Sequence, residues 1–376
     1  MAQKIDGVLT DLRYDAKKDG VWMLFLLGFS CADKEVVEEE ESISIDPTQQ
    51  GEWAVGTRDD LFVNRHGQEM NIQYWYPTED TGIDIHEYDD LFEGTAQDGG
   101  DPSCREKRPV VLFSHGNGGM RYQSYFLMEF LASHGFMVVA PDHLGNTAFD
   151  MGDSPHSELV FRRPEDIIDA YDFLLSEDRF TDCVQEEDGY AVMGHSFGGY
   201  TSIALAGAPL NTEETAIFCT QYPSAWLCDD IAQFAQENGD GIYERHDSRI
   251  WASIPMTPAG YEALGSGLAN IEIPMLFWGG GKDDLTAMEW SVRPLYDGVT
   301  SQKMLAELPQ AGHYTFTNAC DILPAYDDCG EGFLPPEDAH VIINEMTVAF
   351  LAKQLGYKGW EDSLPLSSND LVWIED

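Results

Sequence analysis

The sequence predicts an α/β fold in which a mostly parallel sheet of about eight strands is covered by helices on both faces. Short apolar segments typical of buried strands alternate with amphipathic segments of helical length from about residue 52 onward. One of those apolar segments runs straight into a glycine-rich turn around a single serine, at residues 194–199. The chain has 376 residues, 43% of them hydrophobic, which is enough to bury a large core.

The first expected elements lead up to that turn. Residues 68–77 alternate in polarity, which is typical of an antiparallel strand toward one edge of the sheet. A helix at 121–135 is expected to end at Gly135, and a helix at 162–177 has Pro164 at a position suited to its first turn. The expected buried strands of this half are 108–116, 136–143 and 189–195.

The elements after the turn complete the expected fold. Residues 198–208 are expected to form a helix of small side chains, and residues 209–248 are interpreted as a cap insertion lying over the site. The remaining elements are strands at 249–258, 273–280 and 303–309 and a closing helix at 338–356. We therefore expect one domain over residues 52–358 and a C-terminal tail at 359–376.

The composition is strongly acidic, with 21 Lys and Arg against 67 Asp and Glu and a net charge of −46. This charge excludes nucleic acid and anionic membrane surfaces as partners. It fits a surface kept soluble in a salty medium, although any lineage with acidic proteins would look the same. Residues 32–51 are expected to be a disordered acidic linker, and residues 79–101 a solvated surface loop.

Residues 1–31 have features of a signal peptide. Residues 21–31 form an apolar run that is too short for a mature membrane span but suits a signal-peptide core. The run ends in Ser30 and Cys31, which resembles a bacterial lipoprotein signal, so Cys31 is a candidate lipidation site. We expect export to the periplasm, the outer membrane or the medium, with membrane contact only through this anchor. The alternatives are a buried first strand and a true start further downstream.

The other cysteines support export. Two pairs, each nine positions apart, bracket loop-like sequence, and such pairs suggest disulfides, which require an oxidising compartment. The expected disulfides are Cys219–Cys228, Cys320–Cys329 and, from the two cysteines left over, Cys104–Cys183. Buried free thiols are the alternative. None of the cysteines has zinc-site spacing with histidine, so no metal is expected.

Gly194 to Gly198 match the pattern Gly-x-Ser-x-Gly, which makes Ser196 a candidate nucleophile. In this pattern the serine occupies a strained strand-to-helix turn, and the glycines let strand and helix approach closely. The same five residues also occur in plain glycine-rich turns. Because a serine hydroxyl is a weak nucleophile until a base accepts its proton, catalysis requires further residues elsewhere in the chain.

Those residues are found in the chain order of the α/β-hydrolase arrangement, which runs nucleophile, acid, histidine. Two later strands are followed by Asp283 or Asp284 and then by His313. His313 can take the serine proton, and a buried carboxylate would fix its tautomer. Asp283 is preferred over Asp284 because it stands at the usual point of the turn. His340 falls in a helical pattern and is interpreted as a packing or surface residue.

Two backbone N–H groups are expected to form the oxyanion hole. One belongs to Phe197, directly after the serine. The other belongs to Asn117 in the stretch HGNGG at 115–119, whose glycines leave the backbone open to a substrate oxygen. Together with the aspartate and histidine turns, in the right order, these motifs indicate a serine hydrolase.

Residues 113–143 and 193–205 resemble bacterial relatives of plasma platelet-activating-factor acetylhydrolase, a group also called predicted dienelactone hydrolases. Residues 312–320 fit the same group, and the resemblance covers roughly residues 52–355. It implies an α/β-hydrolase fold and hydrolysis of short or oxidised acyl esters without metal or cofactor. True dienelactone hydrolases use a cysteine nucleophile. Because serine stands here, that name describes the ancestry of the fold and not the substrate.

The resemblance implies the same roles as the motifs do. The roles are nucleophile for Ser196, base for His313, acid for Asp283, and oxyanion donors for Asn117 and Phe197. Three more residues, at strand ends or in loops, are candidates to line the substrate pocket, although each is equally well placed for the core. They are Tyr314, Met256 and Trp278.

We therefore expect an exported, monomeric serine esterase that forms an acyl-enzyme with a small-molecule, lipid or polymer ester. The alternatives are a cutinase-like polyester hydrolase, or a lipase or phospholipase acting on longer chains. Cutinases usually have methionine where this chain has Phe197, and they seldom carry an insertion such as 209–248. Acyl transfer to another acceptor and a catalytically silent binding protein are further alternatives, and the complete triad argues against the silent protein.

Overall fold

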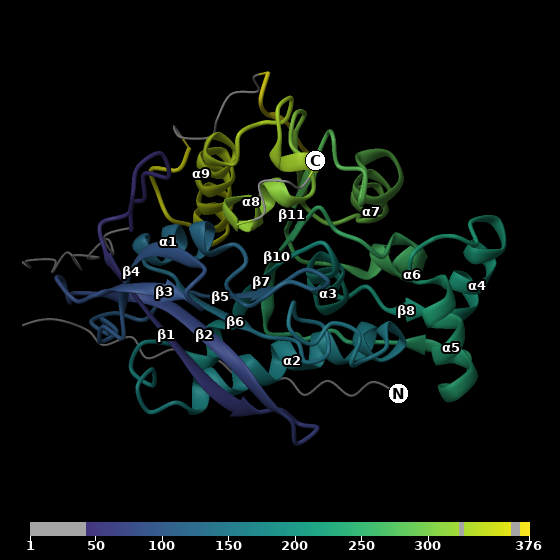
Figure 1. The fold of residues 1–376 in the computed structure, drawn as a ribbon, viewed down its shortest axis with the longest axis horizontal. Helices are drawn as coiled ribbons and strands as arrows, with labels where there is room; N and C mark the ends of the chain where they lie inside the picture. Colours follow the sequence, from purple (N-terminus) through teal and green to yellow (C-terminus); the bar gives the residue numbers. More distant parts are fainter. Residues whose placement is uncertain (1–42, 323–326, 362–368) are drawn as a thin grey trace, which may run out of the picture. The chain divides into compact units, whose positions relative to one another are not determined.

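A computed structural model describes residues 43–322, 327–361 and 369–376 of the chain (Figure 1). Within these residues, eleven strands form one mixed sheet in the order β13-β12-β11-β10-β7-β5-β6-β2-β1-β4-β3. The sheet is parallel from β6 through β5, β7, β10 and β11 to β12. The predicted α/β fold is therefore confirmed, with more strands at the two edges than expected.

The central strands coincide with the predicted apolar runs. The strands of the sheet are β1 (Ala54–Val63), β2 (Glu69–Thr78), β3 (Ile85–Tyr88), β4 (Phe92–Asp98), β5 (Val110–Ser114), β6 (Met137–Pro141), β7 (Tyr190–His195), β10 (Ile250–Met256), β11 (Met275–Gly280), β12 (Lys303–Leu308) and β13 (Val372–Glu375). The helices are α1 (Tyr125–Ser133), α2 (His156–Ser176), α3 (Phe197–Ala206), α4 (Thr212–Gln221), α5 (Cys228–Asn238), α6 (Tyr261–Leu264), α7 (Arg293–Gly298), α8 (Ala319–Ile322) and α9 (Pro336–Gln354). Within the described part of the chain, no helix has the length and apolarity needed to cross a bilayer.

The core lies on both faces of the sheet because side chains alternate along its buried strands. In β5, Val111 and Phe113 pack toward α1 and α9, whereas Val110 and Leu112 pack on the opposite face toward α2. Figure 1 shows α1 and α9 side by side, with α2 on the other side of the sheet. The turn between β7 and α3 thus stands at the carboxyl edge of the parallel strands, where α/β proteins bind their ligands.

The prediction of a solvated loop at residues 79–101 is wrong, because this segment contains β3 and β4. Most of its acidic side chains are exposed, but Tyr88 and Phe92 between them are buried. The Tyr88 hydroxyl accepts the Trp75 indole N–H at 2.7 Å and donates to Glu129 at 2.7 Å. These strands and β1 also extend the sheet beyond β2, so β2 is antiparallel as predicted but lies well inside the sheet.

Both ends of the predicted domain are ordered further than expected. Ile45, in the expected linker, is buried, and its N–H donates to the Lys358 carbonyl at 2.7 Å. The expected C-terminal tail contains Leu371, which is buried, and β13, which pairs antiparallel with β12. Scattered apolar residues anchor these segments although their composition is acidic. The predicted signal peptide, Cys31 and the first part of the linker lie outside the described residues.

Helix α2 begins earlier than predicted, so Pro164 lies inside it and not in its first turn. Proline has no N–H to donate to the carbonyl four residues earlier, which here belongs to Val160. That carbonyl accepts the hydroxyl of Tyr200 from α3 instead, at 3.1 Å. A tertiary hydrogen bond therefore replaces the missing helical one, and a sequence window does not reveal such a replacement.

The insertion at 209–248 is a compact unit of two helices and two short strands. It contains α4, α5 and the separate ladder of β8 (Leu210–Asn211) and β9 (Ile242–Tyr243). Leu227 and Ile231 are buried against the same face of the domain that α3 covers. The insertion is thus packed onto the domain beside the carboxyl end of β7.

Candidate active site

Ser196 occupies the sharp turn between β7 and α3, with a backbone conformation that few non-glycine residues adopt. Its φ is +56° and its ψ is −113°. The turn is held by the Ser196 N–H, which donates to the Met256 carbonyl at 2.9 Å. The turn leaves no room for a side chain at Gly194, because a Cβ there would lie 2.1 Å from the carbonyl oxygen of Gly198. The strained turn therefore presents a half-buried hydroxyl at the sheet edge, as a nucleophile elbow does.

Asp283 and His313 form a buried hydrogen-bonded pair. The His313 Nδ1–H donates to Asp283 Oδ2 at 2.7 Å, and the two residues are 6% and 3% exposed. The other carboxylate oxygen accepts the N–H groups of Leu285 and Thr286, each at 2.8 Å. Burial alone would raise the pKa of Asp283, but the hydrogen bonds from His313 and Thr286 hold that pKa below its usual value. The alternative acid, Asp284, is exposed on the same turn.

His313 is held beside the turn that carries Ser196. The Nε2–H of His195, the residue before the serine, donates to the His313 carbonyl at 2.9 Å, and the two ring centroids are 4.6 Å apart. Burial lowers the pKa of His195 to about 3, so this ring is a neutral structural donor. The structure therefore brings the predicted nucleophile, acid and histidine to one edge of the sheet, after β7, β11 and β12.

The glycine-rich loop after β5 lies against the same turn. A Cβ on Gly116 would lie 3.1 Å from His195 Nδ1 and 3.5 Å from the Cβ of Ser196, so the loop is in close contact with the turn. The Gly116 N–H donates to Gln123 Oε1 at 3.0 Å, which braces the loop. Asn117 follows in this loop, and Phe197 is the first residue of α3. Both expected oxyanion donors thus belong to segments that meet at Ser196.

Two of the three predicted pocket residues belong to the core. Met256, the last residue of β10, and Trp278, within β11, are fully buried on the face covered by α1 and α9. The sequence alone did not show which face they point to. Tyr314 is half-buried, with its ring centroid 5.5 Å from that of His313, and it remains a candidate. His340 is a packing residue as predicted, with Nε2 3.2 Å from two loop carbonyl oxygens.

Three exposed apolar side chains lie beside or within the segments that carry the candidate site residues, and we call them the apolar rim. Trp226 of the insertion stacks edge-on against Phe197, with ring centroids 4.8 Å apart. The Met151 sulfur lies 3.9 Å from Asn117 Nδ2, and Leu285 belongs to the aspartate turn. They are 39%, 60% and 56% exposed, respectively. Sequence reasoning missed all three, because single apolar residues in loops carry no periodic signal.

His156, at the start of α2, joins the insertion to the loop after β5. Its Nε2 lies 2.9 Å from Asn117 Oδ1, and its Nδ1 lies 3.6 Å from Asp230 of α5. Its ring also meets that of Trp226 edge-on at 5.0 Å. The insertion is therefore fixed against the candidate oxyanion loop, which no motif in the sequence indicated.

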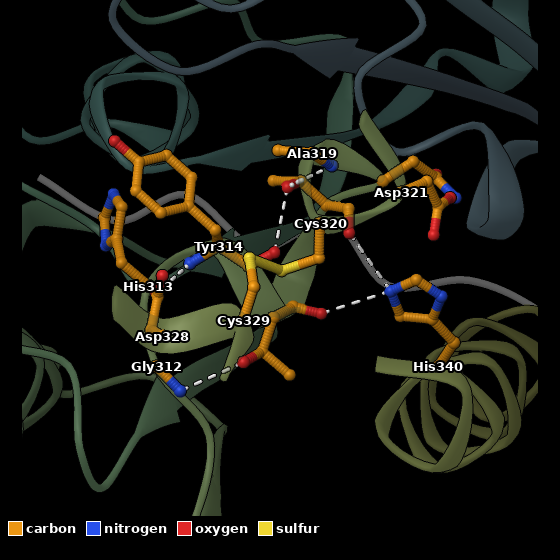
Figure 2. Close-up of a disulfide and its surroundings, with 12 residues drawn as sticks. Gly312, His313, Tyr314, Ala319, Cys320, Asp321, Asp328, Cys329 and His340 are labelled. Carbon is orange, nitrogen blue, oxygen red and sulfur yellow. Dashed lines mark hydrogen bonds between the residues drawn. A yellow bond between two sulfur atoms is a disulfide. The ribbon is translucent and has the colours of Figure 1, made fainter. Parts of the chain in front are cut away.

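The cysteines are joined in the three pairs expected from the sequence: Cys104–Cys183, Cys219–Cys228 and Cys320–Cys329. Figure 2 shows the last of these beside the segment that carries His313. Next to Cys329, the Asp328 carboxylate accepts the Tyr314 N–H at 2.7 Å. This disulfide therefore braces the histidine loop. In the described ranges, no group of three or more His, Cys, Asp or Glu side chains is arranged to hold a metal ion.

Replacing both Cys320 and Cys329 by serine is expected to lower the unfolding free energy by about 2–3 kcal/mol, from the entropy of the short loop. We also expect kcat to fall by about tenfold, because Asp328 no longer holds the histidine loop in place. Thermal melting and ester kinetics measure the two effects. The matched control is the double serine variant of Cys219 and Cys228, which opens a loop of the same length. Equal kcat in the two variants would contradict the bracing role.

Three comparisons with known proteins agree with this geometry. The Chlorophyllase family model matches residues 100–219. The chain is 24% identical over 264 residues to dipeptidyl aminopeptidase BIII of Pseudoxanthomonas mexicana, covering 66% of this chain and 33% of that protein. It is 26% identical over 210 residues to cutinase est2 of Thermobifida alba, covering 54% of this chain and 52% of that protein. The solved structure of a ferulic acid esterase from Streptomyces cinnamoneus matches with a TM-score of 0.60 and 17% identity, over 88% of this chain and 98% of that one.

The chain spans about a third and about half of the lengths of the two curated relatives. The sheet order, the strained serine turn and the buried aspartate–histidine pair are features of the α/β-hydrolase fold, and the ferulic acid esterase structure agrees with that fold. The chain has the α/β-hydrolase fold. Two of the proteins it resembles are esterases by name, the cutinase and the ferulic acid esterase.

Proposed function

We propose that this chain is an exported serine ester hydrolase that cleaves carboxylic esters through an acyl-enzyme. The observation that carries the proposal is the hydrogen-bonded pair of His313 and Asp283 beside the strained turn of Ser196. Export is supported by the three disulfides, which require an oxidising compartment. The similarity to a cutinase and to a ferulic acid esterase supports an ester as the substrate.

In the proposed reaction, Ser196 Oγ attacks the ester carbonyl carbon while His313 Nε2 accepts the hydroxyl proton. The Asp283 carboxylate accepts the Nδ1–H of His313, which leaves Nε2 unprotonated and ready for that proton. The backbone N–H groups of Phe197 and Asn117 stabilise the oxyanion of the tetrahedral intermediate. His313 then protonates the leaving alcohol, and water attacks the acyl-enzyme by the same route to release the acid.

The leading substrate class is an ester with a short or modified acyl chain. This choice is supported by the resemblance to the bacterial relatives of platelet-activating-factor acetylhydrolase. The packing also supports it, because Met256 and Trp278, two of the predicted pocket residues, are fully buried in the core and offer no exposed surface to a long acyl chain.

A cutinase-like polyester hydrolase is the second candidate, and the apolar rim favours it. Trp226, Met151 and Leu285 are exposed beside or within the segments that carry the candidate site residues, and they offer apolar contacts to an extended substrate. The similarity to cutinase est2 of Thermobifida alba supports the same reading.

An acyl-chain series distinguishes the two candidates. The purified chain is assayed on p-nitrophenyl esters from acetyl to palmitoyl, in low and in high salt. Activity confined to the short esters is the expected result for the leading class. Strong activity on long esters, together with release of soluble products from a polyester film, would favour the second candidate. A folded protein with no activity on any ester would overturn the proposal.

A further inference from the structure

Arg163 is a fully buried arginine directly behind the candidate oxyanion loop. Its guanidinium donates to the carbonyl of His115, to Ser114 Oγ at 3.1 Å and to Thr201 Oγ1 at 3.3 Å. A further N–H donates to the Asn146 side-chain oxygen. One side chain thus ties together the end of β5, the loop after β6 and helix α3. The end of β5 and helix α3 meet at the serine turn, and the loop after β6 contacts the candidate oxyanion loop.

In the described part of the chain, no carboxylate oxygen lies within 4 Å of a guanidinium nitrogen of Arg163. A relay of two neutral side chains, Ser114 and His143, connects the Arg163 guanidinium to Asp166 by hydrogen bonds. The Ser114 hydroxyl donates to His143 Nε2 at 2.9 Å, and the His143 Nδ1–H donates to Asp166 Oδ2 at 2.9 Å. Burial lowers the pKa of His143 well below its ordinary value, and the charge of Arg163 adds to this effect, so the ring is neutral. Burial lowers the pKa of Arg163 to about 9, so its charge persists at neutral pH.

This relay repeats the serine–histidine–aspartate order of the candidate triad, but it is not a second catalytic centre. Ser114, His143 and Asp166 are all fully buried, so no substrate reaches the Ser114 hydroxyl. The relay instead helps to orient the Arg163 guanidinium, which also donates to the His115 carbonyl at the start of the oxyanion loop. A buried polar network in which every group has its hydrogen-bond partners holds its side chains in a single arrangement.

Arg163 is also linked to both expected oxyanion donors. Asn146, which it binds, donates from Nδ2 to Asn117 Oδ1 at 2.6 Å, and the Asn146 carbonyl accepts the Gly118 N–H at 3.0 Å. On the other side, the guanidinium carbon lies 4.7 Å from the centre of the Phe197 ring. A change at Arg163 would therefore reach both sides of the hole.

We propose that Arg163 is a positioning residue for the ester reaction. It holds the segments of Asn117 and Phe197 in place and puts a fixed positive charge behind the developing oxyanion. This inference rests on the proposed function. Its effect belongs to the transition state, because a neutral ester carbonyl gains less from a nearby positive charge than an oxyanion does. Loss of Arg163 should therefore lower kcat and leave KM nearly unchanged.

The test compares Arg163→Met with Arg163→Lys in the full chain. We expect about a 100-fold loss of kcat for Arg163→Met on p-nitrophenyl acetate, with KM within about threefold. Arg163→Lys keeps the charge but not the fork of hydrogen bonds, so its kcat should lie between those of the wild type and Arg163→Met. Inactivation by diethyl p-nitrophenyl phosphate should slow in parallel, since its phosphoryl oxygen occupies the same hole.

The control is Arg108→Met, which removes another buried arginine, stacked on Trp53 at 4.2 Å and away from the serine turn. Circular dichroism and thermal melting confirm that each variant is folded. If Arg163→Met does not fold, Asn146→Ala cuts the link to Asn117 and should lower kcat with KM nearly constant. A folded Arg163→Met or Asn146→Ala with wild-type kcat, or an equal loss in Arg108→Met, overturns the inference. Activity retained by Ser196→Ala would overturn the proposed function itself.

Discussion

Ser196→Ala is expected to lose at least about a thousandfold in kcat/KM on p-nitrophenyl acetate. The methyl group leaves the turn intact, because the backbone hydrogen bond from Ser196 to Met256 does not involve the side chain. What disappears is the oxygen that forms the acyl-enzyme, so background attack by water is all that remains. The melting temperature should stay within a few degrees of that of the wild type.

The control for this experiment is Ser202→Ala, on the same helix. The Ser202 hydroxyl is buried and donates to the Gly199 carbonyl at 2.9 Å, a local contact that plays no part in the proposed reaction. Mass spectrometry after treatment with a fluorophosphonate gives an independent readout, with one adduct expected on Ser196 in the wild type and in Ser202→Ala. Ester turnover that survives in Ser196→Ala would contradict the serine mechanism.

The fold and the chain positions of the candidate triad could be predicted from sequence for one physical reason. Parallel strands buried on both faces are continuous apolar runs, and their carboxyl ends meet at a single edge. Ser196, Asp283 and His313 each follow such a run, so the structure has them at the same edge. The choice between Asp283 and Asp284 depended on turn position alone, and it is Asp283 that hydrogen-bonds to His313.

The residues around the site could not be predicted in the same way. Arg163 stands four residues before Ile167 and eight before Tyr171, on the buried face of α2, but a charged side chain gives no apolar signal that it is buried there. Trp226 reaches Phe197 through the packing of the insertion, which has no periodic pattern of its own. Strands β3 and β4 were obscured by their exposed acidic side chains, although Tyr88 and Phe92 are buried between them.

Asp283→Asn is expected to lower kcat/KM by about a thousandfold or more at neutral pH while the protein remains folded. Asp283 Oδ1 accepts two backbone N–H groups, from Leu285 and Thr286, so the amide oxygen of the asparagine must take that position. Its NH2 group then faces His313 Nδ1, which must accept a hydrogen bond instead of donating one. The proton of the neutral imidazole is forced onto Nε2, and that nitrogen can no longer accept the proton of Ser196.

The matched control is Asp284→Asn, which removes the same charge one residue away at an exposed position and should retain wild-type kinetics. Both variants remove one negative charge, but only Asp283→Asn also changes the tautomer of His313. Acid unfolding adds a second readout, because hydrogen bonds hold the pKa of Asp283 below its usual value. Ionised Asp283 therefore stabilises the fold above its unfolded pKa of about 4, and this contribution is lost as pH falls through its lower folded pKa. Asp283→Asn should lack that part of the acid sensitivity. If Asp284→Asn lost activity and Asp283→Asn did not, the acid would have to be reassigned to Asp284, and the hydrogen bond to His313 would have only a structural role.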